Sequence, residues 1–290
     1  MDGILIINKP KNFTSHDVVN VVRKSLNTKK VGHTGTLDPN ATGVLPILIG
    51  KATKLSKYLV EHNKEYIATI KLGEKTTTAD TEGEVIEKDG NLKNILLGLD
   101  EEKIKEILNS FLGKQKQVPP IYSSIKVNGK KAYEYARNGQ AIKLEPRDIE
   151  IYNIELISLI KEELTFKVKC SKGTYIRSLC EDISKKCGTI GYMKELTRTK
   201  VDKFTIENSI TIEELKENPT DEVNKKIVTI EDLFKDKGKI VLNNRKKELF
   251  LNGVRLTIEK PNDIYKVYNE NEFIGLGIVE NNLLKRDIII

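Results

Sequence analysis

GHTGTLDPNATGVLPI, residues 32–47, joins a polar loop to an apolar segment. Its first part, residues 32–43, holds three glycines, three threonines and an Asp-Pro pair, a composition typical of a loop with a fixed backbone path. Residues 44–49 are apolar and predict a buried strand. Taken alone, Asp38 in such a loop is explained as a turn cap, and His33 as an ordinary loop histidine.

Strands are predicted on both sides of this loop. The apolar residues 3–7, followed by Lys9-Pro10, predict one strand, and residues 66–72 predict another. Residues 164–170 alternate between apolar and polar side chains, which is the pattern of a half-buried strand.

Helices are predicted between these strands. Thr14 stands three residues before Asp17, a capping pattern, and the valines that follow recur at helical spacing, so we expect a helix over residues 15–26. Residues 100–112 and 176–187 each place their apolar side chains on one helical face.

Three further segments differ from this core. Residues 114–141 are polar, basic and rich in tyrosine, and we expect them to leave the core as an insertion. The polar residues 218–228 predict a linker. From residue 238 to 290 short strands alternate with turns, which indicates a small β-rich domain. The chain is therefore expected to divide into domains of residues 1–237 and 238–290.

Composition limits the classes of function. The 290 residues include 49 Lys and Arg against 42 Asp and Glu, and the net charge of +7 favours polyanionic partners, although many ordinary lysine-rich proteins are as basic. The three cysteines and three histidines lack metal-ligand spacing, so we expect neither a metal site nor a disulfide framework. No signal peptide or membrane-spanning run is evident, so a cytoplasmic protein without membrane contact is expected.

Five ordered motifs resemble one family. GHTGTLDPNATGVLPI is similar to the catalytic signature of the TruB family, the tRNA pseudouridine-55 synthases. The other four stretches are GILIINKPKNFTSHDVV, KEYIATIKLGEKTTTADTEG, CSKGTYIRSLCEDI and GYMKELTRTKVDKF. The resemblance implies an α+β fold, with a catalytic domain built on a mixed, largely antiparallel sheet of the pseudouridine synthase type. The last 50 residues resemble, more weakly, the small RNA-binding PUA domain of this family.

The resemblance assigns catalytic roles to three residues. Asp38 is implied to be the nucleophile or base, and the sequence leaves open whether it attacks C1′ or assists loss of the base through a glycal. Burial raises the pKa of a carboxyl group, so an ionised Asp38 requires a cationic neighbour. Arg177 is the implied neighbour, and Tyr66 is the implied active-site tyrosine that stacks on the uracil or transfers a proton.

The same resemblance implies residues that bind the substrate. His33 is placed as the base-flipping histidine, because the target uridine lies inside a stacked loop and must be extruded. Tyr175 and Leu196 correspond to the pocket wall, although a core position explains either residue equally well. Lys9 is implied to support the active-site backbone and the tyrosine.

The basic insertion is implied to close over the T arm of tRNA. Lys130 and Lys131 lie there among tyrosines, a combination that suits RNA, although composition alone favours a solvated surface. Related enzymes that act in guide-RNA particles lack this segment. We therefore expect an isomerase that works alone, as a monomer, without cofactor, metal or obligatory protein partner. The alternatives are a guide-dependent synthase in a ribonucleoprotein and a catalytically idle RNA-binding protein.

Overall fold

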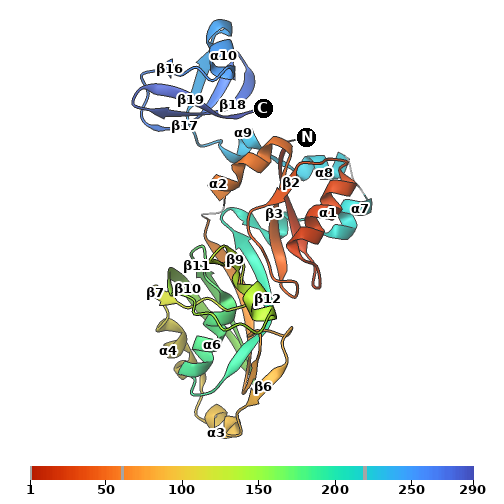
Figure 1. Ribbon diagram of the computed structural model, residues 1–290, viewed down its shortest axis with the longest axis vertical. Coiled ribbons are helices and arrows are strands. Elements are labelled where there is room, and N and C mark those ends of the chain that lie inside the picture. The colour runs from red at the N-terminus through yellow and green to blue at the C-terminus, as the bar shows by residue number, and fades with distance from the viewer. Residues whose placement is uncertain (1, 60–61, 218–220) are drawn as a thin grey trace.

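A computed structural model describes residues 2–59, 62–217 and 221–290, and the molecule is elongated along one axis (Figure 1). Within the described residues a ten-stranded sheet runs through the larger part, and a five-stranded sheet lies at one end. The larger sheet has the order β14 (Val228–Thr229), β1 (Gly3–Lys9), β3 (Thr42–Ile49), β12 (Gly191–Val201), β4 (Lys64–Leu72), β11 (Glu163–Cys170), β10 (Arg147–Ile160) and β7 (Gly113–Gln117). Two short strands extend it, β2 (Val31–His33) on β3 and β13 (Phe204–Thr205) on β12.

The pairing of these strands confirms a mixed, largely antiparallel sheet. Only β3 and β12 run parallel among the described strands of this sheet, with Thr197 opposite Thr42 and Arg198 opposite Gly43. Gly43 has a φ of +102°, and a Cβ atom there would meet the carbonyl oxygen of Arg198 at 2.2 Å. Glycine is therefore required where the two strands join.

The N-terminal half of the sheet is covered by α1 (Ser15–Ser25) and α7 (Ile212–Glu217), which pack their apolar side chains against β1 and β3. The expected helix after Thr14 is confirmed. The main-chain N–H of Asp17 donates to Thr14 Oγ1 at 3.0 Å, and the N–H of Thr14 donates to Asp17 Oδ2 at 2.9 Å. This reciprocal pair satisfies two donors at the helix start.

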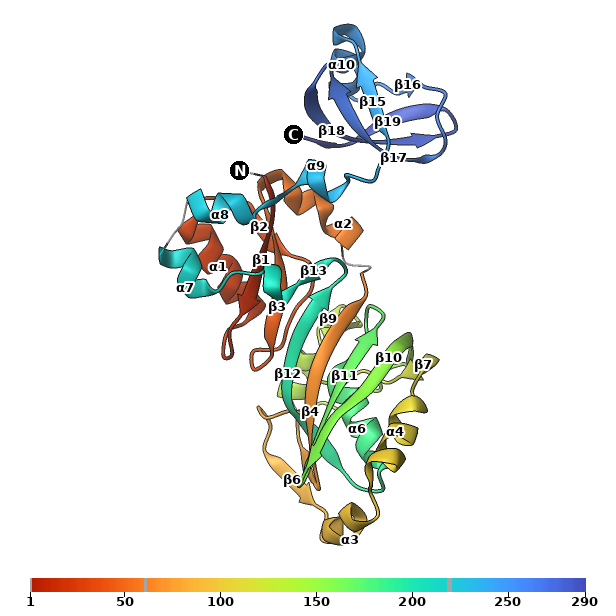
Figure 2. The same ribbon diagram turned by 180° about the vertical axis from the view of Figure 1, so that it is seen from behind.

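The other half of the sheet is covered by α4 (Glu101–Asn109) and α6 (Ile176–Lys186), which lie together beside β10 and β11 (Figure 2). Their apolar faces share one core with Phe166 and Val168 of β11, whose alternation is confirmed. α4 ends three residues before the expected end, because the chain must turn there into β7. Phe111 stays buried just beyond the helix. A short helix, α3 (Leu92–Leu97), precedes α4, and β5 (Glu74–Thr76) pairs with β6 (Val85–Lys88) nearby.

The insertion begins later than expected. Residues 113–117 form the edge strand β7, with Lys114 and Lys116 exposed and Gln117 buried, so the prediction that the excursion starts at residue 114 is wrong. The sequence did not predict this strand, because an edge strand of alternating Gln and Lys has no apolar residues to mark it. Beyond it lie the hairpin of β8 (Lys126–Val127) and β9 (Lys130–Lys131), and α5 (Ala132–Arg137).

The expected linker at residues 218–228 is only partly described. Residues 218–220 lie outside the described part of the chain, but the next six form α8 (Asp221–Lys226). Val223 is buried in the core under α1. A single valine among polar residues gives no helical period, so the sequence predicted a linker where a short packed helix lies.

The C-terminal unit is a sheet of the order β15 (Lys239–Leu242), β17 (Asp263–Asn269), β18 (Glu272–Glu280), β19 (Leu283–Ile289) and β16 (Leu256–Thr257), with α10 (Asn244–Leu251) packed on it. It adjoins the larger part through η1 (Gly50–Leu55), α2 (Ser56–Leu59) and α9 (Ile230–Leu233). Leu276 and Ile288 share a buried cluster with Ile4 and Phe234. The small β-rich unit is present as expected, and it shares a core with the larger part.

Candidate active site

Asp38 lies in the loop between β2 and β3, and this loop is fastened on both sides of the carboxylate. The N–H of Leu37 donates to Ser15 Oγ at 2.9 Å, and that hydroxyl donates to the carbonyl of Leu37 at 3.2 Å. The buried ammonium of Lys9 donates to the carbonyl of Pro39 at 2.9 Å. The residues before and after Asp38 are therefore fixed to the body of the domain. Lys9 thus supports the loop backbone.

The carboxylate of Asp38 opens into a cavity of about 460 Å³. Cavities of several hundred Å³ are the usual size of small-molecule sites. The residues that line it beyond the Asp38 loop include Tyr66, Asp80, Tyr122, Tyr175, Arg177, Leu196 and Arg198. The topology thus brings residues from both halves of the sheet and from the insertion to one place.

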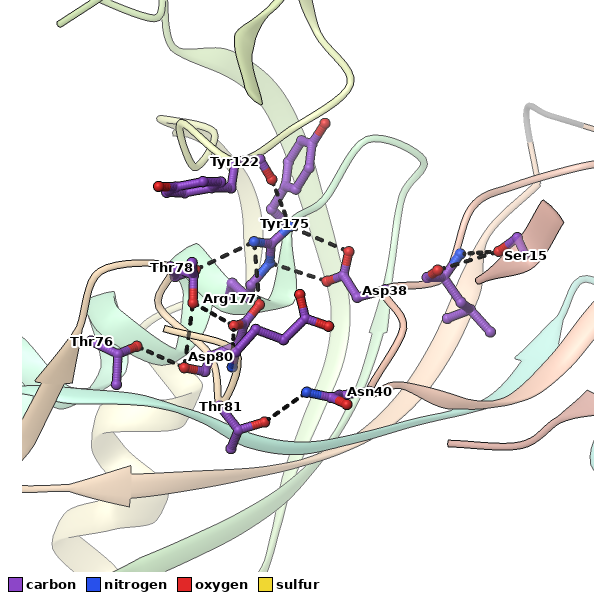
Figure 3. Close-up of polar contacts among 12 residues, drawn as sticks. Ser15, Asp38, Asn40, Thr76, Thr78, Asp80, Thr81, Tyr122, Tyr175 and Arg177 are labelled. Carbon is purple, nitrogen blue, oxygen red and sulfur yellow. Dashed lines mark hydrogen bonds and ion pairs between the residues drawn. The ribbon is translucent and has the colours of Figure 1, made fainter. Parts of the chain in front are cut away.

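Arg177 in the first turn of α6 binds Asp38 with two donors. Its Nε lies 3.1 Å from Asp38 Oδ2, and its Nη2 donates to Oδ1 at 3.3 Å (Figure 3). Burial raises the pKa of Asp38, and the charge of Arg177 opposes this rise. A planar guanidinium that grips both carboxylate oxygens also fixes the direction in which the carboxylate points.

Asp80, in the turn after β5, binds Arg177 from the side away from Asp38. Its Oδ2 lies 3.3 Å from Arg177 Nη1, and its side chain is 6% exposed. Asp80 Oδ1 accepts from Thr78 Oγ1 at 2.5 Å and from the N–H of Glu82 at 3.0 Å. Arg177 therefore lies between two carboxylates, and it also donates to the carbonyls of Thr78 and Tyr122 (Figure 3).

Tyr66 on β4 faces Arg198 on β12, directly opposite in the sheet. Arg198 is almost wholly buried, and it donates to the carbonyl of Val44 at 2.7 Å and to that of Gly35 at 3.1 Å. Burial raises the pKa of Tyr66 to about 12, against the charge of Arg198, which hydrogen-bonds the phenol. Tyr66 is therefore a neutral phenol near neutral pH, held by a buried arginine.

The predicted substrate-binding residues are placed differently from one another. Tyr175 and Leu196 both line the cavity. His33 lies on β2 rather than in the loop, and it is not among the described residues that line the cavity. Burial and the charge of Arg198 lower the pKa of His33, so the neutral imidazole is favoured.

The insertion contributes its own residues to the cavity. Tyr122, Tyr133 and Arg137 line it, and the guanidinium of Arg137 lies 5.3 Å from the ring centroid of Tyr133. Lys130 and Lys131 lie in the β8–β9 hairpin and are absent from the described lining. The aromatic part of the insertion therefore faces the site, and the two lysines lie outside it.

Neither a metal cluster nor a membrane span is found in the described part of the chain. Residues 2–59, 62–217 and 221–290 hold no group of three or more His, Cys, Asp and Glu side chains able to bind a metal ion. Over the same residues no helix is long and apolar enough to cross a membrane. The three cysteines are buried and free.

Two family models match this sequence. The family model "TruB family pseudouridylate synthase (N terminal domain)" matches residues 23–176. The chain belongs to the TruB family. A second model, "tRNA pseudouridylate synthase B C-terminal domain", matches residues 177–235. The TruB resemblance of the five motifs is thereby confirmed.

Curated relatives from several bacteria share this TruB sequence over nearly its full length. The tRNA pseudouridine synthase B of Alkaliphilus oremlandii is 46% identical and covers 97% of this chain and 94% of its own. Those of Clostridium tetani and Aquifex aeolicus are 44% and 40% identical, covering 96% and 98% of this chain and 95% and 98% of their own. The relatedness therefore extends through the C-terminal unit.

Solved structures confirm the α+β fold expected of TruB. A chain in the crystal structure of a Cbf5-Nop10-Gar1 complex superposes with a TM-score of 0.68 at 26% identity, covering 99% of this chain and 83% of that one. A chain in an H/ACA RNP bound to a substrate RNA containing 2'-deoxyuridine gives the same score at 24% identity, covering 99% and 85%. The second likeness concerns the fold alone.

Two residues at this TruB site were missed by sequence reasoning. Asp80 and Arg198 lie inside the quoted stretches KEYIATIKLGEKTTTADTEG and GYMKELTRTKVDKF, but no spacing marked them. Charge gave no signal either, because both stretches hold several other charged residues, which are exposed or half-buried. A charged side chain that is buried must find a partner, and Arg177 and Tyr66 are those partners.

Proposed function

We propose that this chain isomerises uridine 55 in the T arm of tRNA to pseudouridine, without guide RNA or cofactor, and that Asp38 is the catalytic residue. The observation that carries the proposal is the two-point contact between Arg177 and Asp38 at the wall of a cavity that also holds Tyr66. The names of the curated relatives support tRNA as the substrate.

The chemistry of the reaction fits these groups. Isomerisation breaks the bond between N1 and C1′ and forms a bond between C5 and C1′. C5 loses a proton and N1 gains one, so no electrons are gained or lost and no redox cofactor is needed. The Asp38 carboxylate either attacks C1′ or assists departure of the base through a glycal. In both routes Arg177 favours the ionised carboxylate and aims it.

Tyr66 supplies a neutral face for the rotating base. Its pKa of about 12 keeps the phenol protonated, so the ring stacks on uracil without adding charge to the cavity. The hydroxyl is held by Arg198 and is placed to donate a proton rather than to remove one. Tyr175 and Leu196 complete the wall around the base.

The RNA is held outside this cavity by the basic insertion. Lys130 and Lys131 contact phosphates of the T arm, and the tyrosines beside them approach unstacked bases. His33, outside the cavity, braces the space that the extruded uridine leaves. Residues 238–290 act as a PUA-like RNA-binding domain beside a catalytic domain of residues 1–237. The enzyme works as a monomer in the cytoplasm.

The test uses a T-arm hairpin RNA and measures pseudouridine in the presence of EDTA. The wild-type chain should form product without any added RNA or protein. Asp38→Asn should form none, with RNA affinity within about tenfold, because the carboxylate acts in the transition state. Asp202→Asn, in a half-exposed turn paired with His62, is the matched control and should stay active.

Three outcomes would contradict the proposal. Product formed by Asp38→Asn at more than a trace rate would remove Asp38 from catalysis. A wild-type chain that is active only when a guide RNA and partner proteins are supplied would favour the guide-dependent alternative. A chain that binds the hairpin with high affinity but modifies nothing would instead be an idle RNA-binding protein.

A further inference from the structure

The start of α6 is held by a buried amide from another element. Gln117, the last residue of β7, is 4% exposed. Its Nε2 donates to the carbonyl of Tyr175 at 3.0 Å, and its Oε1 accepts from the N–H of Tyr175 at 2.8 Å. One side-chain amide therefore satisfies both main-chain groups of Tyr175, as a neighbouring strand would.

Tyr175 is the N-cap residue of α6. Its backbone is extended, with φ −96° and ψ 112°, and its side chain makes no capping hydrogen bond. The carbonyl of Tyr175 already accepts from the N–H of Leu179 at 3.1 Å, so the two bonds from Gln117 replace no missing cap and act instead on the angle at which the chain enters the helix. Gln117 fixes that angle from outside the helix.

The position of Tyr175 matters because catalytic groups depend on it. The Tyr175 ring lines the cavity, and two residues later Arg177 reaches Asp38. Two further contacts join the same region, from Ser178 Oγ to the carbonyl of Val118 at 2.9 Å and from Arg177 Nη2 to the carbonyl of Tyr122 at 2.9 Å. The first residues of the insertion are thus attached to the first turn of α6.

We propose that Gln117 is a positioning residue for pseudouridine formation: its amide clamps the main chain of Tyr175, so that the Tyr175 ring meets the base and the Arg177 fork meets Asp38. The inference rests on the proposed function. A neutral amide suits the place, because it offers a donor for the carbonyl of Tyr175 and an acceptor for its N–H, whereas a carboxylate would offer acceptors only. A buried polar side chain is costly unless its hydrogen bonds are made, and here both bonds go to one residue.

Gln117→Met tests the clamp, since methionine fills a similar volume and makes neither bond. Gln115→Met is the matched control. Gln115 lies on the same strand, and its amide likewise donates to a main-chain carbonyl, that of Phe111, at 2.6 Å, just beyond the end of α4. The measurements are the single-turnover rate on the T-arm hairpin, the RNA affinity, the melting temperature and the pH profile of the rate.

Gln117→Met should lower the chemical rate by up to about 100-fold, since a displacement of about 1 Å in a catalytic group has effects of that size. RNA affinity should stay within about twofold of wild type, and Gln115→Met should keep its rate. A misplaced Arg177 lowers the pKa of Asp38 less, so the acid limb of the Gln117→Met profile should move to higher pH. A purely structural role would leave that limb unmoved.

A Gln117→Met rate equal to that of Gln115→Met would overturn the inference, as would a loss confined to RNA affinity. If Gln117→Met folds poorly, the same measurements are made on Gln117→Glu. It keeps the shape and the acceptor but loses the donor, and it should also slow the chemical step; an unchanged rate would refute the clamp. A wild-type chain that forms no product on any tRNA substrate would instead remove the proposed function on which the inference rests.

Discussion

Replacing Asp80 by Asn isolates the part played by the second carboxylate at Arg177. Asp80 Oδ1 accepts from Thr78 Oγ1 and from the N–H of Glu82, whereas Oδ2 faces Arg177 Nη1 at 3.3 Å. Asparagine keeps one oxygen for the first two donors. It presents an NH₂ group to Arg177, which has donors only, so the charged contact is lost.

The size of the effect follows from that one contact. For this ion pair we take about 1.5–3 kcal/mol, the range for a hydrogen bond to a charged group. If all of it serves to orient Arg177 in the transition state, the rate falls about 10- to 150-fold, since each ~1.4 kcal/mol is tenfold in rate. The carbonyls of Thr78 and Tyr122 still hold Arg177, so the loss should lie toward the lower end.

The pH profile of Asp80→Asn should shift as well. The negative charge of Asp80 raises the pKa of Asp38. Because the carbonyls of Thr78 and Tyr122 keep Arg177 beside Asp38, removal of the Asp80 charge lowers that pKa, so the ionised Asp38 and the activity should persist to lower pH. The acid limb should therefore move opposite to that of Gln117→Met.

The assay is single-turnover release of tritium from uridine labelled at C5, because C5 loses its hydrogen in the reaction. Asp89→Asn is the control. Asp89 likewise accepts from a hydroxyl, that of Thr189, and from a main-chain N–H, that of Asn91, but it does not line the cavity. An Asp80→Asn rate within twofold of this control, or an acid limb that moves to higher pH, would refute the reasoning.

Three further predictions concern residues in and around the site. Arg177→Lys keeps the charge but loses the two-point contact with Asp38, so its single-turnover rate should fall even on a hairpin whose uridine is already unstacked. The same unstacked RNA should restore the rate of His33→Ala, because less energy is then needed to extrude the base. Equal rescue of both variants would contradict the division of roles. The double variant Lys130→Ala, Lys131→Ala should weaken hairpin binding and reduce the slope of log affinity against log salt by about one unit or less per lost phosphate contact. An unchanged slope would mean that the two lysines are solvated surface residues without phosphate contacts. Burial lowers the pKa of Lys9 to about 8 from 10.5, so the unfolded chain holds this proton more tightly and the free energy of unfolding should rise with pH between those values. Urea melts across that range should show this contribution in wild type and not in Lys9→Met; the same slope in both would mean that Lys9 is not the group responsible.

Regular patterns in the sequence predicted much of the fold. The capped helix after Thr14 and the alternating strand β11 were evident because each has one apolar face and one polar face. Strand β7 and helix α8 were missed because an edge strand and a short surface helix bury too few side chains to leave a period. What buries them is contact with distant segments, which spacing along the chain does not reveal.

The site depends even more on such distant contacts. Asp38 and Arg177 stand 139 residues apart, and only the family resemblance paired them before the structure placed them in contact. Asp80, Arg198 and Gln117 act on other protein groups, and their types and spacing carry no sign of that. The roles of the predicted residues stay predictions until the variants above are measured.

The shared core between the C-terminal unit and the larger part affects how deletions should be interpreted. Leu276 and Ile288 are fully buried with Ile4, and Asp287 accepts a hydrogen bond from Tyr58 Oη at 2.5 Å. Cutting the chain near residue 238 would uncover apolar surface beside β1, the strand that leads to Lys9. A truncated enzyme with low activity would therefore have lost structural support for the Asp38 loop, whatever RNA contacts it had also lost.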